Sequence, residues 1–285
     1  MKSILSILLF ATLYFSAKSQ DMIYGKVLDA STLNPLAYVN IGIKGKELGT
    51  TSNLEGVFKL NITTNHLNDS ITFSYVGYKE KSFLINELLG LKEITIPLYP
   101  AITSLQEVIV NANDKWKIEN QGVSKYFGAQ FSYEHSAGKN DNMEEVGQKL
   151  NLGDEQVKVL SFNIFLANNI VDSATFRINF YDFSEQQPGE RVFTREIIIR
   201  QAITKGWLSV NLEAYNIWLK GSILSSIEFL RSSEKGKAFS PWYGGVAFSN
   251  KGISYHRSTS LGKWSMEDES FSIYLRIKRR VNKSR

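Results

Sequence analysis

Acidic side chains in two turn-like stretches are the residues whose type and spacing could support catalysis. They are Asp141, Glu144, Glu145, Asp182, Glu185 and Glu190. Two carboxyl groups about 5–9 Å apart can hydrolyse a glycosidic bond. Proximity along a loop does not by itself create that spacing, so we interpret these acids as solvated turn residues. A hydrolase that uses carboxylates of the second half of the chain stays the alternative.

Metal ligands and activated nucleophiles have few candidates in this chain. There is no cysteine, which excludes disulfides, thiolate zinc sites and a cysteine nucleophile. The three histidines, His66, His135 and His256, lie far apart and have no metal-ligand spacing. A structural calcium in loop 140–145 stays an alternative, although the loop lacks the spacing of an EF-hand. We therefore expect no catalytic residue, no metal and no cofactor.

Aromatic residues near expected strand ends are the stronger indication of a binding function. The five tryptophans are Trp116, Trp207, Trp218, Trp242 and Trp264, and Trp242 is followed by Tyr243 in a Pro-Trp-Tyr-Gly-Gly run. Exposed indole rings can stack on sugars or anchor a protein partner. We expect most of the tryptophans to pin two sheets together, and we choose Trp242, Tyr243 and Trp264 as candidate ligand-binding residues.

The start of the chain has the pattern of a signal peptide. Lys2 precedes an apolar run over residues 4–17, and the small residues Ala17 and Ser19 follow. We expect cleavage after Ser19 or one residue later, and no transmembrane span in the mature chain. These features predict an exported protein, periplasmic or associated with the cell surface or outer membrane.

The net charge of +5 is concentrated at the two ends of the chain. Residues 276–285 carry six basic groups, and Lys2 and Lys18 lie in the signal peptide. Subtracting these eight cations from +5 leaves −3 for the rest. A nucleic-acid-binding face would be basic over a folded surface, so we expect no nucleic-acid partner. We interpret the end of the chain as a solvated basic tail, with a contact to an anionic surface as the alternative.

Residues 22–99 alternate between apolar and polar side chains as strands do. One alternating set contains Ile23 and Val27, another Val39, Ile41 and Ile43, and others run over residues 58–62, 71–75 and 94–96. Turn residues fill the gaps, and residues 83–90 indicate a helical turn. Short strands at regular spacing predict a small β-sandwich.

The run from Gly25 to Lys79 resembles the carboxypeptidase-like regulatory domain family. The resemblance rests on a G-x-V-x-D strand, a turn with Pro, a G-T turn, a hairpin ending G-x-F, and S-x-x-G-Y. In this chain the positions are Gly25, Val27, Asp29, Pro35, Gly49, Thr50, Asn53, Gly56, Phe58, Ser74, Gly77 and Tyr78. The resemblance implies a transthyretin-like seven-stranded sandwich, common in exported proteins of Bacteroidota-type bacteria.

The types of these motif residues suit a structural role. We expect Gly49 and Gly56 to adopt backbone angles that other residues resist, and Asn53 to form a turn where the family has Asp. His66 lacks the further ligands of a zinc carboxypeptidase, so we reject peptidase activity.

Residues 104–111 resemble the linker that precedes the plug of TonB-dependent transporters. The remaining chain is too short for a large barrel, so we prefer a strand followed by a polar linker.

Residues 122–279 are predicted to form a second and larger sandwich. About nine or ten strands are expected there, among them 159–166, 176–181, 192–200, 207–212 and 222–230. Two packed antiparallel sheets, jelly-roll-like, would bury them. This part is loosely similar to carbohydrate-binding-like modules.

The sequence thus predicts an all-β protein with a definite order of segments. They are a signal peptide (1–19), a carboxypeptidase-like regulatory domain (21–100), a strand and linker (101–121), a β-sandwich (122–279) and a basic tail (280–285). We expect a non-catalytic binding or assembly protein of the cell envelope, with a glycan or an envelope protein as partner. An accessory role to an outer-membrane transporter is a further alternative. The sequence does not reveal the ligand or the oligomeric state.

Overall fold

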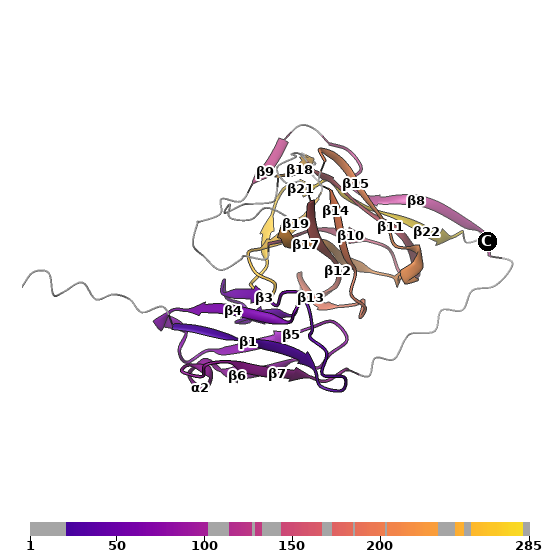
Figure 1. Cartoon of the computed structure of the whole chain (residues 1–285). Coiled ribbons are helices and arrows are strands. Elements are labelled where there is room, and N and C mark those ends of the chain that lie inside the picture. Colours follow the sequence, from indigo (N-terminus) through magenta and orange to yellow (C-terminus); the bar gives the residue numbers. More distant parts are fainter. Residues whose placement is uncertain are drawn as a thin grey trace, which may run out of the picture.

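The computed structural model describes most of the chain after the first twenty residues. The described residues are 21–101, 114–126, 129–132, 144–166, 173–184, 186–202, 204–232, 243–247 and 252–281. Almost all regular structure in them is β-strand, which confirms the predicted fold class. Two bodies are visible in Figure 1: the indigo and purple segments form one, and the pink, orange and yellow segments form the other above it.

The first domain consists of two small sheets. One has the order β4-β1-β7 and the other β3-β2-β5-β6, which together make the seven strands that the resemblance implies. The strands are β1 (Asp21–Asp29), β2 (Asn40–Gly42), β3 (Gly49–Thr51), β4 (Val57–Ile62), β5 (Ser70–Ser74), β6 (Lys81–Leu84) and β7 (Ile94–Leu98). A 3-10 turn η2 (Thr64–His66) and a short helix α2 (Ile85–Leu88) join them.

The predicted alternation forms the core of this domain. Ile23 and Val27 of β1 point inward with Phe58, Leu60 and Ile62 of β4, and all five are almost completely buried. At Gly25 the chain of β1 approaches β7 so closely that a Cβ atom would lie 2.3 Å from the carbonyl oxygen of Ile94. The motif glycine therefore permits close parallel pairing of these two strands.

The second domain also has two sheets, both antiparallel. The first has the order β13-β12-β17-β10-β19-β20, with β14 paired to β12. Its strands are β10 (Glu145–Asn151), β12 (Ser173–Ser184), β13 (Gln187–Arg191), β14 (Ile198–Ala202), β17 (Ser222–Ser232), β19 (Ser254–Arg257) and β20 (Ser265–Glu267).

The other sheet of this domain has the order β21-β18-β11-β22-β8, with β15 and β16 paired to β11 and β9 paired to β18. Its strands are β8 (Trp116–Gly122), β9 (Ala129–Ser132), β11 (Val157–Leu166), β15 (Gly206–Asn211), β16 (Trp218–Leu219), β18 (Tyr243–Ala247), β21 (Ser270–Phe271) and β22 (Ile273–Arg280). A 3-10 turn η3 (Glu213–Tyr215) follows β15.

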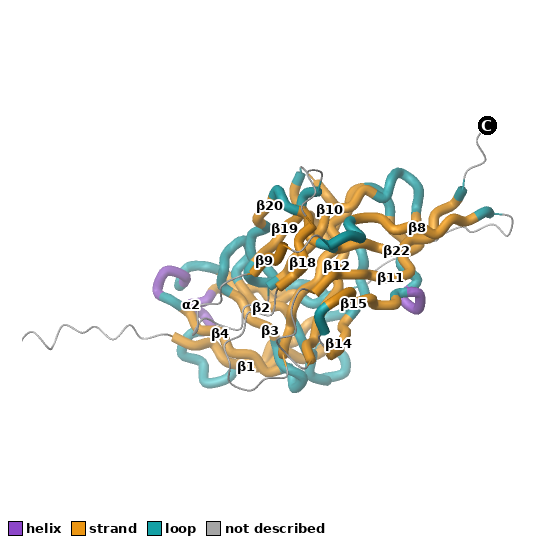
Figure 2. The backbone as a smooth tube through the Cα atoms, turned by 90° about the horizontal axis from the view of Figure 1, so that it is seen from above, coloured by secondary structure: helices purple, strands orange, loops and turns teal. Residues whose placement is uncertain are grey.

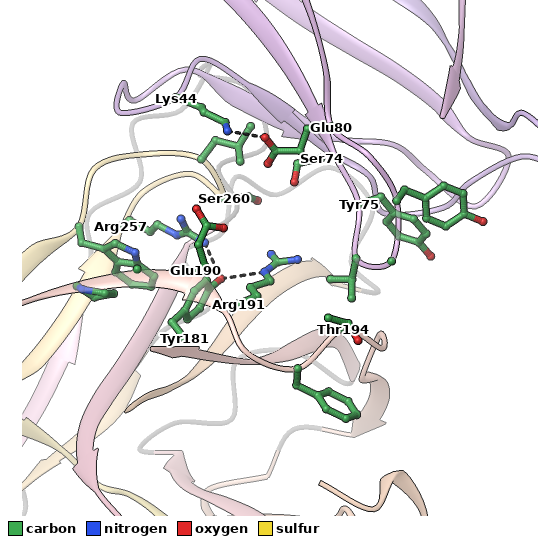
Figure 3. Close-up of a pocket in the computed structure, with 18 residues that line it drawn as sticks. Lys44, Ser74, Tyr75, Glu80, Tyr181, Glu190, Arg191, Thr194, Arg257 and Ser260 are labelled. Carbon is green, nitrogen blue, oxygen red and sulfur yellow. Dashed lines mark hydrogen bonds and ion pairs between the residues drawn. The ribbon is translucent and has the colours of Figure 1, made fainter. Parts of the chain in front are cut away.

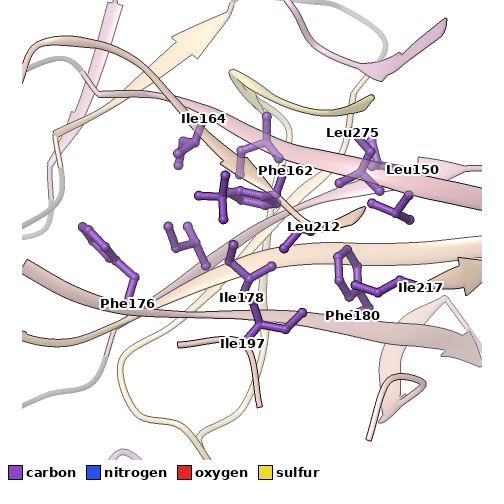
Figure 4. Close-up of a cluster of buried hydrophobic side chains, with 14 of the residues drawn as sticks. Leu150, Phe162, Ile164, Phe176, Ile178, Phe180, Ile197, Leu212, Ile217 and Leu275 are labelled. Atoms are coloured by element: carbon purple, nitrogen blue, oxygen red, sulfur yellow. The ribbon is translucent and has the colours of Figure 1, made fainter. Parts of the chain in front are cut away.

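Apolar side chains from both sheets fill the space between them (Figure 4). Phe176, Ile178 and Phe180 of β12 meet Phe162 and Ile164 of β11 there. The exposed fraction of each is 2% or less. The long alternating runs in the sequence thus form the packed interior of the sandwich.

Several boundaries differ from the prediction because short or polar strands alternate weakly. Residues 116–121, expected in a linker, belong to β8, an edge strand that pairs with β22. The acidic stretch expected as a loop leads directly into β10, and of the strand expected over 192–200 only the end is present, as β14. The second domain thus begins before residue 122 and consists of more and shorter strands than expected.

The basic residues near the end of the chain are part of the fold up to Arg280. Arg276, Lys278, Arg279 and Arg280 belong to β22, which lies with β8 away from the first domain (Figures 1 and 2). Arg279 donates to a carboxylate oxygen of Glu119 and to the carbonyl of Leu152. Arg276, Lys278 and Arg279 lie within the range predicted for the sandwich, and Arg280, predicted as the first residue of the tail, is also held by the strand pairing.

Other predictions fall on residues outside the description. They are the signal peptide over residues 1–19 and the strand expected over 104–111. Among the described residues, no helix combines the length and the hydrophobicity that crossing a membrane requires.

Candidate functional site

A row of charged residues crosses four neighbouring strands of the β12 sheet, on the face opposite its core. Arg177 on β12 stands opposite Glu228 on β17, and Glu228 stands opposite Glu145 on β10. Glu145 in turn stands opposite Arg257 on β19. Directly opposed side chains in a sheet are close enough to interact, and the sequence +, −, −, + places each carboxylate beside one guanidinium.

Arg177 connects this row to the first domain. Its side chain is 1% exposed, and its Nη1 donates to Asn40 Oδ1 at 2.6 Å and to Glu228 Oε2 at 2.9 Å. Nη2 donates to the carbonyl of Tyr38, whose φ of 61° lies in the left-handed region, and Nε donates to Glu196 at 2.8 Å. Every side-chain nitrogen of Arg177 thus donates a hydrogen bond, and two of the four bonds reach residues of the first domain.

Glu145 is the centre of the other half of the row. Its Oε1 accepts hydrogen bonds from Asn179, Tyr181 and Ser226 at 2.5–3.0 Å. Its Oε2 accepts from Nε and Nη2 of Arg257 at 2.8 and 2.5 Å. The carboxylate is completely buried, so its charge is balanced by a two-point contact with arginine.

The charges around Glu228 keep this carboxylate ionised. Burial favours the neutral form of Glu228, but the positive charges of Arg177, Arg191 and Arg257 outweigh it and lower the pKa of Glu228 to about 2. A carboxylate that stays ionised near neutral pH is a poor proton donor. The lone pairs of Glu145 are occupied by its hydrogen bonds, so neither acid is free for hydrolysis.

A pocket of about 430 Å³ opens between the two domains beside this row (Figure 3). The first domain contributes Lys44, Ser74, Tyr75, Val76, Gly77, Tyr78 and Glu80. The second contributes Tyr181, Pro188, Gly189, Glu190, Arg191, Phe193, Thr194, Arg257, Ser260, Leu261 and Trp264. Small-molecule sites fall in this size range and occur preferentially at domain interfaces.

The S-x-x-G-Y motif of the first domain lines this pocket. Gly77 has a φ of +81°, and the ring of Tyr78 packs against that of Tyr75 at 5.3 Å. The Tyr78 hydroxyl donates to Asp29 Oδ2 at 2.6 Å, and Asp29 Oδ1 accepts from the backbone of the turn that follows β1. Burial and then the bond to Asp29 raise the pKa of Tyr78 to about 12. The Asp and Tyr motif positions therefore form one contact that orients the pocket wall.

Two other motif positions have different roles. Asn53 accepts backbone hydrogen bonds from Glu55 and Val57, and Gly56 has a φ of +73°. Both residues confirm the expected turn. The prediction for Gly49 is wrong: it does not have a positive φ, and a Cβ atom there would lie 3.2 Å from Thr259 of the second domain. Gly49 allows the close approach of the two domains.

Residues 23–110 match the family model of the CarboxypepD_reg-like domain. The match supports the carboxypeptidase-like regulatory domain that the motif resemblance predicted for this part of the chain. The match covers less than half of the chain and ends before the second sandwich.

No curated protein matches this chain. Among solved structures, the infectious bursal disease virus VP2 subviral particle has 10% identity over 93% of this chain, with a TM-score of 0.29. The structure of the Gx strain of the same virus has 12% identity over 91%, also with a TM-score of 0.29. The chain spans 61% and 63% of those two structures. Scores this low support no argument about fold or function.

One of the three predicted ligand-binding residues lies in the pocket. Trp264 is half-buried there, with its ring 4.3 Å from the Arg257 guanidinium and 5.5 Å from the Tyr181 ring. Trp242 lies outside the described residues, and for Tyr243 only the backbone of β18 is described. Trp264 directly precedes β20, which belongs to a different sheet from β18.

The expectation for the other tryptophans is wrong where they are described. Trp116, Trp207 and Trp218 do not belong to the buried cluster between the sheets. Trp207 is 40% exposed and packs edge-on against Phe165 and Tyr274, and Trp116 packs against Trp218. Aliphatic and phenylalanine side chains fill the core instead, because they interdigitate there without a polar group to satisfy.

The acids of the sequence prediction divide into two groups. Glu144 and Glu145 are buried rather than solvated, because β10 runs through the centre of its sheet. Glu190 is exposed, and Asp182 accepts its backbone N–H at 2.7 Å, as turn residues do. Asp141, Glu185 and loop residues 140–143 lie outside the described residues.

The histidines in the description contact single acids. His66 Nδ1 lies 2.8 Å from Asp69, and His256 Nδ1 lies 3.1 Å from Glu267. His135 lies outside the described residues. Within the part of the chain that the structure describes, no three His, Asp or Glu residues are grouped as metal ligands.

Sequence reasoning missed the central residues of this site. Arg177 and Asn179 alternate with Phe176 and Ile178 and therefore have the pattern of a solvent face. The one available signal was an arginine between apolar residues of a predicted strand, and that signal does not identify what covers the face. Here the first domain covers it.

Proposed function

We propose that this chain is an exported, non-catalytic binding and assembly protein of the cell envelope, with a glycan as ligand in the interdomain pocket. The observation that carries the proposal is the shared construction of the pocket, since motif residues of the regulatory-type domain form one wall and Trp264 and Arg257 lie in the other. A ligand there would contact both domains at once. Binding would therefore also stabilise their arrangement.

The side chains in the pocket suit a sugar. Tyr75, Tyr78 and Trp264 offer ring surfaces of the kind on which sugar rings stack. Ser74 and Thr194 provide hydroxyl groups, and charged groups next to them can bond to sugar hydroxyls. This combination of aromatic and polar groups supports a glycan over a purely apolar ligand.

Two observations support binding over catalysis. The buried acids of the row, Glu145 and Glu228, are engaged by arginines, so the alternative of a hydrolase finds no free acid pair in this row. The first domain matches a non-catalytic family type. Export rests on the apolar run after Lys2, which remains a prediction from the sequence.

Titration of the purified mature chain with oligosaccharides from bacterial envelope polysaccharides tests the proposal. We expect saturable binding by calorimetry and a loss of about tenfold or more in Trp264→Ala. Trp207→Ala is the matched control, because Trp207 is exposed on the other sheet. Turnover of the oligosaccharides, or binding lost in Trp207→Ala and retained in Trp264→Ala, would refute the proposed function or its site.

A further inference from the structure

Arg191 is the arginine of the cluster that no carboxylate contacts closely among the described residues. Its side chain is 18% exposed and lines the pocket. The nearest carboxylate oxygen in the described part of the chain is that of Glu228, at 3.9 Å, too long for a hydrogen bond. Its Nε donates to the Tyr181 hydroxyl at 3.3 Å. A guanidinium has five N–H donors, and the Nε bond to Tyr181 is the hydrogen bond that this side chain makes within the described part of the chain.

The neighbours of Arg191 cannot supply the missing acceptor. Glu228 is engaged by Arg177, Asn179 and Ser260. The Tyr181 hydroxyl already contacts Glu145 and Arg257. Each of the other two arginines has its own carboxylates, at 2.9 Å or less. A guanidinium largely removed from water and left with one long hydrogen bond is complementary to an anionic ligand group.

The geometry favours a planar, two-oxygen partner. In Figure 3 the Arg191 guanidinium points into the space between the domains, between the Tyr181 side and the Ser74 and Glu80 side. Arginine recognises carboxylates through two parallel N–H bonds. In the first domain's wall, Lys44 is already paired with Glu80 at 2.5 Å, so Arg191 is the cation that remains available.

The rest of the lining selects among carboxylate ligands. Glu190 is exposed in the pocket beside Arg191 and can accept hydrogen bonds from hydroxyl groups. Tyr75, Tyr78 and Trp264 provide ring surfaces. A ligand that offers a carboxylate, several hydroxyls and an apolar ring face satisfies all of them, whereas a small inorganic anion satisfies Arg191 alone.

We infer that the interdomain pocket binds an acidic sugar, with the carboxylate of a uronic acid residue on the Arg191 guanidinium. This inference rests on the proposed function, because it specifies the class of glycan. Arg191 is then the residue that determines specificity for acidic over neutral sugars. The aromatic residues contribute to the binding of both.

Matched pairs of sugars test the inference directly. Methyl β-D-glucuronide and methyl β-D-glucoside differ only at the carboxylate, and methyl galacturonide and galactoside form a second pair. We expect the mature chain to bind one of the uronides about 10- to 100-fold more tightly than its neutral partner, by calorimetry and ligand-observed NMR. Arg191→Gln should abolish that difference, because binding of the uronide should fall to that of its neutral partner. Arg191→Lys keeps the positive charge but loses the two parallel N–H donors of the guanidinium. This variant should retain part of the preference for the uronide.

Controls separate the inference from the function on which it rests. Arg195→Gln, on an exposed arginine outside the pocket lining, should bind like the wild type. Equal binding of uronides and neutral sugars, with Trp264→Ala weakening both, would overturn the inference and leave the proposed function standing. Absence of binding by all four sugars and by the envelope oligosaccharides would overturn both. Acetate, phosphate or glycine binding as tightly as the uronide would overturn the assignment to a sugar. If Arg191→Gln does not fold, the comparison of each uronide with its neutral partner on the wild-type protein still tests the inference.

Discussion

Replacing Arg177 by methionine removes a side chain that is hydrogen-bonded to residues of both domains. Arg177 is 1% exposed and contacts Glu196, Glu228, Asn40 and the carbonyl of Tyr38. Without it, the completely buried Glu228 loses its closest cation. Loss of one partner from a buried ion pair costs about 3–5 kcal/mol. We therefore expect Arg177→Met to lower the free energy of unfolding by that amount.

The design of the assay follows from where the tryptophans lie. All five are at or after residue 116, so tryptophan fluorescence reports on the second domain, whereas far-ultraviolet circular dichroism reports on both. We expect the two signals to coincide during urea unfolding of the wild type, because buried contacts couple the domains. In Arg177→Met they should separate, with each domain unfolding in its own transition.

A double-variant cycle identifies the cause. Arg177→Met with Glu228→Gln should recover about 1–3 kcal/mol relative to the sum of the single changes, because the buried charge left behind is removed as well. Arg195→Met, at an exposed arginine, should change stability by no more than about 0.5 kcal/mol. A single variant that unfolds at the wild-type midpoint with coincident signals would refute the coupling of the domains through Arg177.

Three further predictions concern single positions. Burial raises the pKa of Glu144 from 4.5 to about 7, so the folded state binds the proton more tightly and stability should fall by up to about 3 kcal/mol as pH rises through that interval. Glu144→Gln should remove this decline in pH-dependent urea unfolding, and an unchanged slope would contradict it. Gly25→Ala places a Cβ atom against the Ile94 carbonyl and should cost about 1–3 kcal/mol; a wild-type unfolding midpoint would show that β1 and β7 tolerate wider spacing. In Tyr78→Phe the pKa of Asp29, lowered first by the Tyr78 hydroxyl and then by backbone N–H groups of the following turn, should rise toward its ordinary value in a carbon-detected NMR titration, and no change there would refute that role of the motif.

The sequence was sufficient to predict the strands that fill the two cores. Period-two alternation over residues 57–62 and 157–166 corresponds to strands whose inward residues are buried. Alternation of apolar and polar residues indicates that one face of a strand is buried. In these strands that alternation is the strongest pattern in the sequence. Strand β8 escaped prediction because it is an edge strand without a buried residue.

The site itself could be predicted only in part. Trp264 was predicted as a ligand-binding residue from its residue type, and it lines the pocket. The motif residues Ser74, Gly77 and Tyr78 were predicted as structural residues, and their place in the pocket wall was not expected. Arg177 looks like a solvent-facing residue in the sequence, because the side chain that it contacts in the first domain, Asn40, lies more than a hundred positions away in the chain. No local pattern contains that information, because the docking of two domains is a property of the folded surfaces.

A crystal structure of the mature chain soaked with methyl β-D-glucuronide would test the central claim most directly. We predict electron density for the sugar between the domains, with its carboxylate on Arg191 and its ring against Tyr78 or Trp264. Density elsewhere on the molecule, or an empty pocket in crystals soaked at a concentration that saturates binding in solution, would contradict it.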